Sequence, residues 1–380
     1  MKIRIIGGGP AGLFFAYLMG RANSAHDIRV YERDREDCTY GWGLVFSDVA
    51  LSFVRDVAPE LYASMTQDQV VFDAMAIVHK GEHVRLAGNM FHRIARMDLL
   101  QALHRHCRAV GVMLEFEHRC DDITGFGDCD LIVAADGANS AIRSRYRDRF
   151  DPTLDQRPNM FAWYGTTRLF APLSLIFRQH RDGLIIAHCY QYSATHSTFL
   201  VEVPPDTFHR AGLDHMSEAE SLAYCEAAFA KDLDGHPLLS NHSSWFRYTI
   251  VQNSDWCFDN VVLLGDALRT GHPSIGSGTR LAMQDAIALF DAHETAGTKV
   301  PMMLRRFRQI RRPGSDALQQ AAIRSTEWYE NVSDKLHLDP ISFAYDYLRR
   351  SGRVTHADIR QRDPELAAKY EALHPFVERS

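Results

Sequence analysis

Glycines and a carboxylate near the start of the chain have the types and the spacing that binding of a dinucleotide requires. Gly7, Gly9 and Gly12 follow the pattern G-x-G-x-x-G. In such a turn the glycines allow a tight bend, a close approach of a pyrophosphate to the backbone and close packing of a helix on a strand. Glu32 comes about 20 residues later, where an acid accepts hydrogen bonds from ribose hydroxyls. We therefore predict a dinucleotide site made of Gly7, Gly9, Pro10, Ala11, Gly12, Glu32 and Arg33.

Two further carboxylates follow segments that have the pattern of buried strands. Asp136 directly follows residues 130–135, and Asp266 follows residues 260–264 and one glycine. A buried parallel strand that ends in an acid delivers its carboxylate to the carboxyl edge of the sheet, where ligands of open α/β sheets bind. We therefore expect Asp136 and Asp266 at the ligand.

The stretch after Asp266 is an irregular loop rich in glycine and proline that leads into a helix predicted at 280–293. Backbone N–H groups in such a loop, together with the positive end of the helix dipole, can hold developing negative charge. The candidates there are Gly276, Gly278 and Thr279.

The surrounding segments must bring these residues to one edge of a parallel sheet. Strand patterns at 2–6 and 28–32 enclose an apolar helical segment at 13–20, which predicts a βαβ unit. Aromatic and β-branched runs within 155–255 predict a mostly antiparallel sheet instead. We expect an α/β protein with a Rossmann-like dinucleotide-binding domain at 1–69, 96–154 and 256–300, an interleaved substrate domain made of a hairpin at 70–95 and the sheet at 155–255, and a C-terminal helical region at 301–380.

Prolines and glycines mark the expected ends of several elements. They predict a helix over 50–65 that Pro59 can split, a hairpin over 70–91 that turns at Lys80-Gly81, and a helical stretch over 302–332 that is interrupted at Pro313-Gly314.

Composition limits the partners and the compartment. The chain has 380 residues, is 46% hydrophobic and carries a net charge of −6 at pH 7. This charge produces no basic field, so we expect no nucleic-acid partner. Seven scattered cysteines without a C-x-x-C pair indicate reduced cytoplasmic thiols and no metal site. No run approaches the ~18 apolar residues of a membrane span, and the glycines and proline at 7–10 would interrupt a secretion signal. We therefore expect a cytoplasmic protein without a membrane partner.

Three motifs occur in order along the chain: Gly7, Gly9 and Gly12 with Glu32, then Asp136-Gly137, then Gly265-Asp266 with Pro273, Gly276 and Gly278. Together they resemble the fingerprints of the class A FAD-dependent aromatic hydroxylases. The resemblance implies FAD as cofactor, NAD(P)H as transient reductant, O2 as co-substrate and hydroxylation through a C4a-hydroperoxyflavin. By position it also implies Arg96 at the ribityl–pyrophosphate region, Asp136 in the motif associated with FAD and NAD(P)H, Asp266 at the ribityl hydroxyls, and the loop 273–279 at the isoalloxazine.

Longer segments are similar to the aryl-CoA hydroxylases, which act on salicylyl-CoA and 2-aminobenzoyl-CoA, and to the violacein-pathway tryptophan hydroxylase. They lie at 41–48, 163–167, 196–202, 271–279 and 325–330. This likeness implies hydroxylation of an aryl-CoA thioester, with an indole- or tryptophan-derived substrate as the alternative. Arg269 stands where the wider family usually has His, and Pro273 stands where the closer relatives tend to have Phe. Both positions border the expected flavin pocket, so the substrate stays open.

Candidate residues for the substrate come from the sheet and from the loop. Trp163, His188 and Tyr190 are candidates to line the pocket, and His272 and Pro273 are the catalytic candidates of the loop. Alternate strand residues often belong simply to the core, which is the competing interpretation of each. A side chain that deprotonates the substrate would resemble histidine, and the sequence selects none. A flavin oxidase or reductase, or a non-enzymatic protein-binding relative, is the alternative function, and we expect a monomer or a homodimer.

A run of basic residues offers a place for the phosphates of CoA. It comprises Arg305, Arg306, Arg308, Arg311 and Arg312. The competing interpretation is a solvated helix face.

Overall fold

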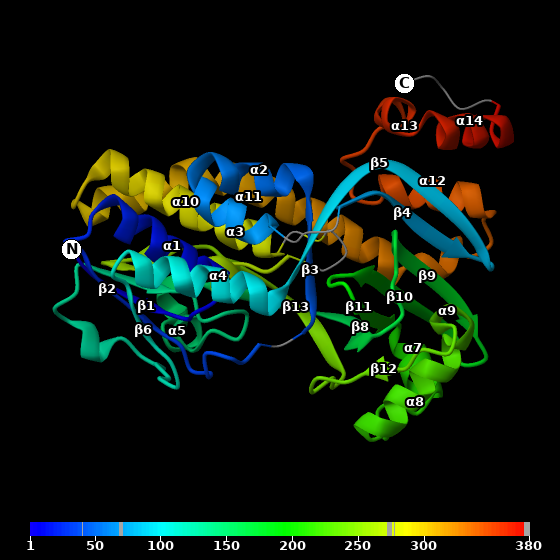
Figure 1. Ribbon diagram of the computed structural model, residues 1–380, viewed down its shortest axis with the longest axis horizontal. Helices are drawn as coiled ribbons and strands as arrows, with labels where there is room; N and C mark the ends of the chain where they lie inside the picture. The colour runs from blue at the N-terminus through cyan, green and yellow to red at the C-terminus, as the bar shows by residue number, and fades with distance from the viewer. Residues whose placement is uncertain (40, 68–70, 272–275, 277, 376–380) are drawn as a thin grey trace.

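The computed structural model describes residues 1–39, 41–67, 71–271, 276 and 278–375. Within these residues the chain forms two sheets, each with its own covering helices, and the long helix α11 (Val300–Glu330) runs from one to the other (Figure 1). The N-terminus lies on the lobe of the first sheet and the C-terminal helices lie above the second. The predicted mixed α/β class is therefore confirmed.

The first sheet has six strands among the described residues. In spatial order they are β14 (Cys257–Phe258), β15 (Val261–Leu263), β7 (Leu131–Ala134), β1 (Lys2–Ile6), β2 (Asp27–Tyr31) and β6 (Met113–Glu115). Strands β15 to β6 pair in parallel, and only β14 runs antiparallel to its neighbour. All four residues of β7 are buried, as expected of a parallel strand that is covered on both faces.

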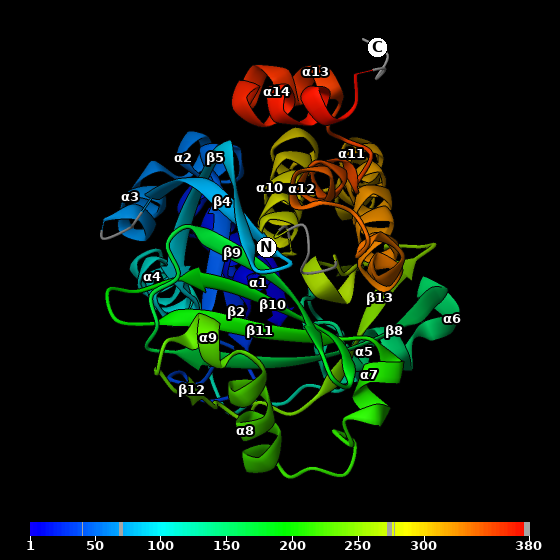
Figure 2. The same cartoon turned by 90° about the vertical axis from the view of Figure 1, so that its right-hand side faces the viewer.

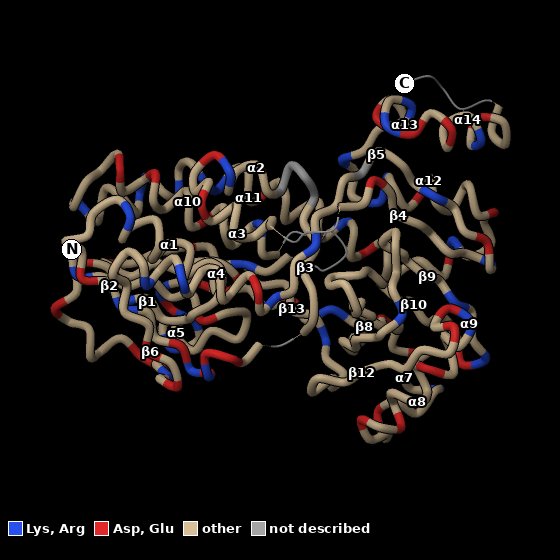
Figure 3. The backbone as a smooth tube through the Cα atoms, viewed as in Figure 1, with Lys and Arg blue, Asp and Glu red and all other residues tan. Residues whose placement is uncertain are grey.

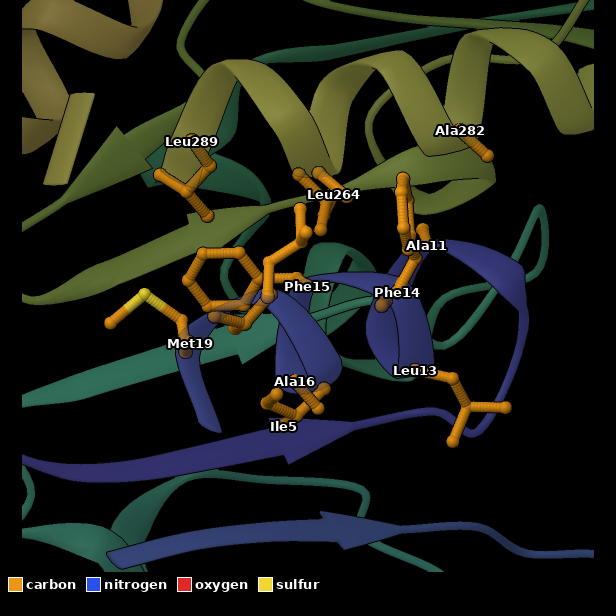
Figure 4. Packing of buried hydrophobic residues seen from close by; sticks show 14 of the residues in the cluster. Ile5, Ala11, Leu13, Phe14, Phe15, Ala16, Met19, Leu264, Ala282 and Leu289 are labelled. Carbon is orange, nitrogen blue, oxygen red and sulfur yellow. The ribbon is translucent and has the colours of Figure 1, made fainter. Parts of the chain in front are cut away.

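Helix α1 (Pro10–Ala22) is buried between this sheet and α10 (Gly278–Ala296). Figure 4 shows Phe14 and Phe15 of α1 in the layer between β1 and α10. Segments beside α1 pack closely on it where the helix has a glycine. A Cβ at Gly20, for example, would lie only 2.8 Å from Val110 Cγ2. An apolar helix that is covered on all sides belongs to the interior, and this one holds the glycine turn rigidly.

The second sheet has nine strands among the described residues. In spatial order they are β12 (Leu238–Leu239), β8 (Pro152–Thr166), β11 (Ser197–Val203), β10 (Gly183–Gln191), β9 (Leu173–His180), β4 (Val71–His79), β5 (Glu82–Ala95) and β3 (Gly43–Ser47), and β13 (Phe246–Asn253) pairs along β8. Only the β4–β9 pair is parallel. The predicted turn at Lys80-Gly81 joins β4 to β5, and both of its residues have positive φ.

Helices cover both faces of the second sheet (Figure 2). One face packs on α7 (Pro205–Arg210), α8 (Glu218–Ala228) and α9 (Ala230–Leu233). The other face packs on the end of α11 and on α12 (Pro340–Arg349), α13 (His356–Arg362) and α14 (Pro364–Leu373). The remaining helices are α2 (Asp48–Val57), α3 (Pro59–Thr66), α4 (Arg96–Ala109), α5 (Ala141–Arg145) and α6 (Arg147–Phe150).

Two prolines affect the helices differently. Pro59 separates α2 from α3, as the sequence predicts. Pro313 lies inside α11, which continues without interruption, so the predicted break at Pro313-Gly314 is wrong. A proline in a helix removes one hydrogen bond and crowds the preceding turn. In α11 both residues face solvent, while Phe307 before them and Gln319 after them are buried, so packing on both sides keeps the helix continuous.

None of the described helices is long and apolar enough to cross a membrane.

Candidate cofactor and substrate site

The glycine turn has the geometry that a pyrophosphate needs. A Cβ at Gly12 would lie 2.3 Å from the carbonyl oxygen of Gly7, and Gly7 itself has a φ of +108°. These two glycines therefore close the turn. A Cβ at Gly9, by contrast, would meet no atom within 4 Å. Gly9 precedes the first turn of α1, where free N–H groups and the positive helix end face the same open space.

The Glu32 carboxylate is bound to the glycine turn. Its Oε2 accepts a hydrogen bond from Gly8 N–H at 2.7 Å and its Oε1 accepts one from Asp34 N–H at 2.9 Å. Each carboxylate oxygen can accept a second hydrogen bond, so both remain usable by ribose hydroxyls. Arg33 does not join this group, because its side chain is mostly exposed and lies 3.6 Å from the carboxylate of Asp34.

Asp136 offers an acceptor that the described residues leave unused. Its Oδ2 accepts a hydrogen bond from Ile142 N–H at 3.2 Å, whereas its buried Oδ1 has no partner in the described part of the chain. Burial raises the pKa of this carboxyl group. A buried acceptor without a partner is costly, and a hydroxyl donor of a bound molecule would satisfy it. Beside it, Gly137 faces open space.

The charges of Asp266 and Arg96 interact. The Asp266 side chain is exposed, yet the protein around it raises the pKa of the carboxyl group by desolvation. An accessible carboxyl group in such surroundings lines a recess rather than the outer surface. Burial lowers the pKa of Arg96, its Nε has no partner among the described residues, and each of the two charges favours the charged form of the other.

The N-terminal end of α10 completes the cofactor candidates. Gly278 and Thr279 open the helix, and a Cβ at Gly278 would meet nothing within 4 Å. Gly276 has a φ of +56° and open space on its Cβ side out to 4.0 Å. His272 and Pro273, the catalytic candidates of the loop, lie outside the described residues. The glycine turn, Asp136, Asp266 and the α10 end therefore combine open space with unused polar groups, and they fit the expected FAD.

The three substrate candidates share one face of the second sheet. Leu200 of β11 pairs with Trp163 of β8 on one side and with His188 of β10 on the other. The side chains of Trp163, Leu200 and His188 therefore form a row across three neighbouring strands. Tyr190 is two residues beyond His188 and points the same way. Its hydroxyl donates to Gly43 O at 2.9 Å, and burial raises its pKa to about 12. This face is directed toward α11, since the His188 ring lies 5.2 Å from that of Tyr329.

Two functional candidates on this face were missed by the sequence reasoning. His188 Nε2 lies 2.9 Å from Glu202 Oε2, and Asn159 Nδ2 donates to Glu202 Oε1 at 2.8 Å. Glu202 is fully buried. The available signal was an acidic residue inside the apolar run 197–203, since an acid is almost never fully buried without a partner.

The aromatic loop before β3 packs reciprocally on β8 of the second sheet. A Cβ at Gly165 would lie 2.8 Å from the ring of Trp42, and a Cβ at Gly41 would lie 3.3 Å from the ring of Trp163. Each tryptophan therefore rests on a glycine of the other segment. This contact fixes the position of Trp163 relative to the loop that precedes β3.

Arg269, at the position that departs from the wider family, is a buried structural ion. It pairs with Asp285 of α10, and Arg311 Nε donates to the same Oδ1 atom at 2.6 Å. Its guanidinium also lies 5.0 Å from the Trp256 ring. The Arg269 side chain is thus directed at α10 and α11.

Residues 1–322 match the protein family described as FAD binding domain. Three curated proteins are similar to nearly the whole chain. Salicyloyl-CoA 5-hydroxylase of a Streptomyces species is 36% identical, over 92% of this chain and 70% of that protein. Protodeoxyviolaceinate monooxygenase of Chromobacterium violaceum is 34% identical, over 92% and 95%. The 3-hydroxy-4-methyl-anthranilyl-(aryl-carrier protein) 5-monooxygenase of Streptosporangium sibiricum is 33% identical, over 94% and 97%.

Solved structures share the fold at lower identity. A variant of 2-methyl-3-hydroxypyridine-5-carboxylic acid oxygenase superposes with a TM-score of 0.73 at 18% identity, over 95% of this chain and 98% of that chain. PqsL of P. aeruginosa superposes with a TM-score of 0.68 at 20% identity, over 88% and 98%.

Proposed function

This chain belongs to the FAD-binding family of flavoprotein aromatic monooxygenases, and we propose that it hydroxylates the ring of an aromatic acyl thioester with NAD(P)H and O2. The predicted family, enzyme class and FAD cofactor are confirmed by the similarities above. The observation that carries the thioester is that two of the three relatives are named for aryl groups borne on CoA or on a carrier protein.

The cofactor would be held by groups from several segments of the chain. In this proposal the open backbone at Gly9 receives the pyrophosphate, Glu32 binds the adenosine ribose, and Asp266 with Arg96 binds the ribityl–pyrophosphate region. The orphaned Oδ1 of Asp136 and the open start of α10 supply the remaining polar contacts. When bound and reduced, FAD supplies the oxygen chemistry, and the protein supplies binding, orientation and electrostatics.

The substrate ring would rest on the face that carries Trp163, His188 and Tyr190. In this proposal Glu202 accepts the Nε2–H of His188, which leaves the lone pair on Nδ1. We propose that Nδ1 accepts a proton from a hydroxyl or amino group on the substrate ring. Removing that proton increases the electron density of the ring and so favours its hydroxylation. The aromatic neighbours exclude water from this side of the ring.

Substrate turnover and product mass test the proposal together. NAD(P)H consumption is measured with salicyloyl-CoA, the matching free acid and a set of indole compounds. The proposal expects stimulation by the thioester and a product heavier by one oxygen atom. Consumption with no oxygen gained would identify an oxidase or reductase.

The second candidate is hydroxylation of an indole-derived substrate without a thioester. It is favoured by the similarity to protodeoxyviolaceinate monooxygenase, which covers 95% of that protein. Stimulation by an indole compound but by no thioester would select it.

A further inference from the structure

Arginines from three segments are linked by a contact and by charge: Arg324 contacts the segment that carries Arg353, and the charge of Arg353 acts on Arg280 in the first turn of α10. Arg280 lies in that turn, Arg324 lies on α11 and Arg353 follows α12; these three are called the arginine cluster below. Arg324 Nε donates to Ser351 O at 2.9 Å, and its Nε would lie 3.1 Å from a Cβ at Gly352. Arg324 therefore fixes the segment that carries Arg353 against α11.

The cluster has no counter-charge among the described residues. Arg280, Arg324 and Arg353 make no ion pair with a described carboxylate. Arg280 is half-buried, and its Nε is buried without a partner in the described part of the chain. Burial lowers the pKa of Arg280, and the charges of Arg353 and Arg311 lower it further, so like charges lie close together here.

The basic run expected from the sequence does not form such a site. Arg308 pairs with Asp255 at 2.9 Å, Arg311 with the buried Asp285 at 2.6 Å, and Arg312 with Asp316 at 3.5 Å. Only Arg305 and Arg306 are left exposed without a described ion pair. The prediction that this run is a phosphate site is therefore not supported, since most of its charge is neutralised within the protein.

Such an unpaired cluster is unusual in this molecule. The net charge is −6, and Figure 3 shows basic and acidic residues interspersed along most of the chain. Gathered cations repel one another, and the repulsion grows where protein replaces water. An anion bound between them removes this cost. Guanidinium groups match phosphate oxygens in geometry, with two parallel hydrogen bonds each.

The position of the cluster indicates which phosphates it would bind. Arg280 is two residues from Gly278, at the helix end assigned to the cofactor. Arg324 precedes Tyr329 on α11 by five residues, about 7.5 Å along the helix, and Tyr329 packs on His188. We propose that the arginine cluster binds the phosphate groups of a phosphopantetheine thioester whose aryl ring lies at His188. This inference rests on the proposed function. CoA and a carrier protein both present this phosphopantetheine chemistry.

The test compares Arg353→Ala and Arg324→Ala with the control variants Arg305→Ala and Arg306→Ala in the FAD-loaded enzyme. The probes are salicyloyl-CoA, salicyloyl-4′-phosphopantetheine and salicyloyl-pantetheine, which carries no phosphate. For the two phosphorylated thioesters we expect KM to rise by about tenfold or more in the cluster variants, because each loses charge-assisted hydrogen bonds. The KM for salicyloyl-pantetheine, and kcat for all three, should stay unchanged. The control variants should have the KM values of the wild type. Added salt should raise the KM of the wild type for the phosphorylated thioesters toward the values of the cluster variants.

The inference would be overturned if the cluster variants changed KM equally for the phosphorylated thioesters and for salicyloyl-pantetheine, or if they changed no KM value. If KM rises for salicyloyl-CoA only, the cluster binds the phosphates of the nucleotide part. If KM rises for salicyloyl-CoA and for salicyloyl-4′-phosphopantetheine, the cluster binds the phosphate that these two compounds share. If the wild type turns over no thioester, the proposed function fails, and calorimetric titration of CoA then decides the cluster separately. CoA binding that is lost in Arg353→Ala would support the phosphate site, and no binding to the wild type would overturn it.

Discussion

His188 Nε2 lies 2.9 Å from the fully buried carboxylate of Glu202, and Asn159 donates to the other oxygen of that carboxylate at 2.8 Å. The His188 side chain keeps 9% of its surface exposed. A carboxylate that holds one ring nitrogen of a histidine fixes which nitrogen carries the proton and how the ring is oriented. In the proposed mechanism this arrangement makes Nδ1 the nitrogen that accepts a proton from the substrate.

We therefore expect His188→Gln to lower kcat for salicyloyl-CoA by about 10²- to 10⁴-fold, the usual contribution of a positioned base. Glu202→Gln keeps an acceptor for the ring but removes the negative charge that stabilises a protonated imidazole, so it should shift the acidic limb of the pH profile of kcat/KM to lower pH. A thioester with a fluorinated, more acidic phenol should lose less activity in both variants. Unchanged pH profiles with FAD still bound would rule out this role.

The glycine turn allows a matched pair of substitutions. Gly9→Ala adds a Cβ into open space, so the apoprotein should keep its melting temperature while FAD binding is lost. Gly12→Ala places a Cβ 2.3 Å from Gly7 O, so it should destabilise the apoprotein itself. Thermal unfolding without FAD and flavin fluorescence titration separate the two effects. Normal FAD affinity in Gly9→Ala would contradict the assigned position of the pyrophosphate.

Glu32 should contribute to FAD affinity through charge-assisted hydrogen bonds, which are each worth about 1.5–3 kcal/mol. We expect Glu32→Ala to weaken FAD binding by about tenfold to a hundredfold, measured as cofactor retained through gel filtration and by titration of the apoprotein. Asp34→Asn is the control, because Glu32 bonds only the backbone N–H of Asp34. Stoichiometric FAD in Glu32→Ala would show that the assignment is wrong.

Asp285 balances two arginines, Arg269 and Arg311, and is fully buried. Asp285→Asn removes the charge that pairs with both arginines, so it should lower the free energy of unfolding by about 3–5 kcal/mol. Asp316→Asn is the control, since Asp316 is exposed and pairs with Arg312 at 3.5 Å, a contact worth at most about 1 kcal/mol. Urea unfolding compares them. Equal losses in both variants would contradict the importance of the buried pair.

Asp266 makes the stability of the apoprotein depend on pH. Desolvation raises its folded pKa above the ordinary value of 3.8, although Arg96 opposes the shift. The charged form therefore costs stability; the cost is absent below pH 3.8 and grows as the pH rises through the folded pKa. Asp266→Asn should raise the melting temperature of the apoprotein more at pH 8 than near pH 4.

With FAD added, the same variant should bind the cofactor more weakly or lose coupling between NAD(P)H use and product. A displacement of the reacting group by about 1 Å can cost a hundredfold in rate. A melting difference that does not vary with pH, together with unchanged coupling, would contradict both roles of Asp266.

The sequence predicted those parts of the site that depend on local backbone chemistry. The spacing of Gly7, Gly9 and Gly12 and the position of Glu32 identified the turn, and the structure has the glycine conformations that this turn requires. Asp136 and Asp266 were found because each comes within three residues of the end of a buried strand. The turn at Lys80-Gly81 and the break at Pro59 were predictable for the same reason, since neighbouring residues determine them.

Contacts between distant segments were decided only by the tertiary structure. Asn159, Glu202 and His188 meet because the registers of β8, β11 and β10 place them on one face, and no local spacing encodes a register between strands. Arg353 acts electrostatically on Arg280, 73 residues earlier in the sequence, and Arg324 of α11 holds the segment after α12 through Ser351 O. The arginines of the basic run at 305–312 are close in sequence but do not act as one basic site. Helix packing gives most of them a carboxylate partner. Local chemistry therefore determined the candidate cofactor site, whereas long-range packing decided which charges keep no carboxylate partner among the described residues.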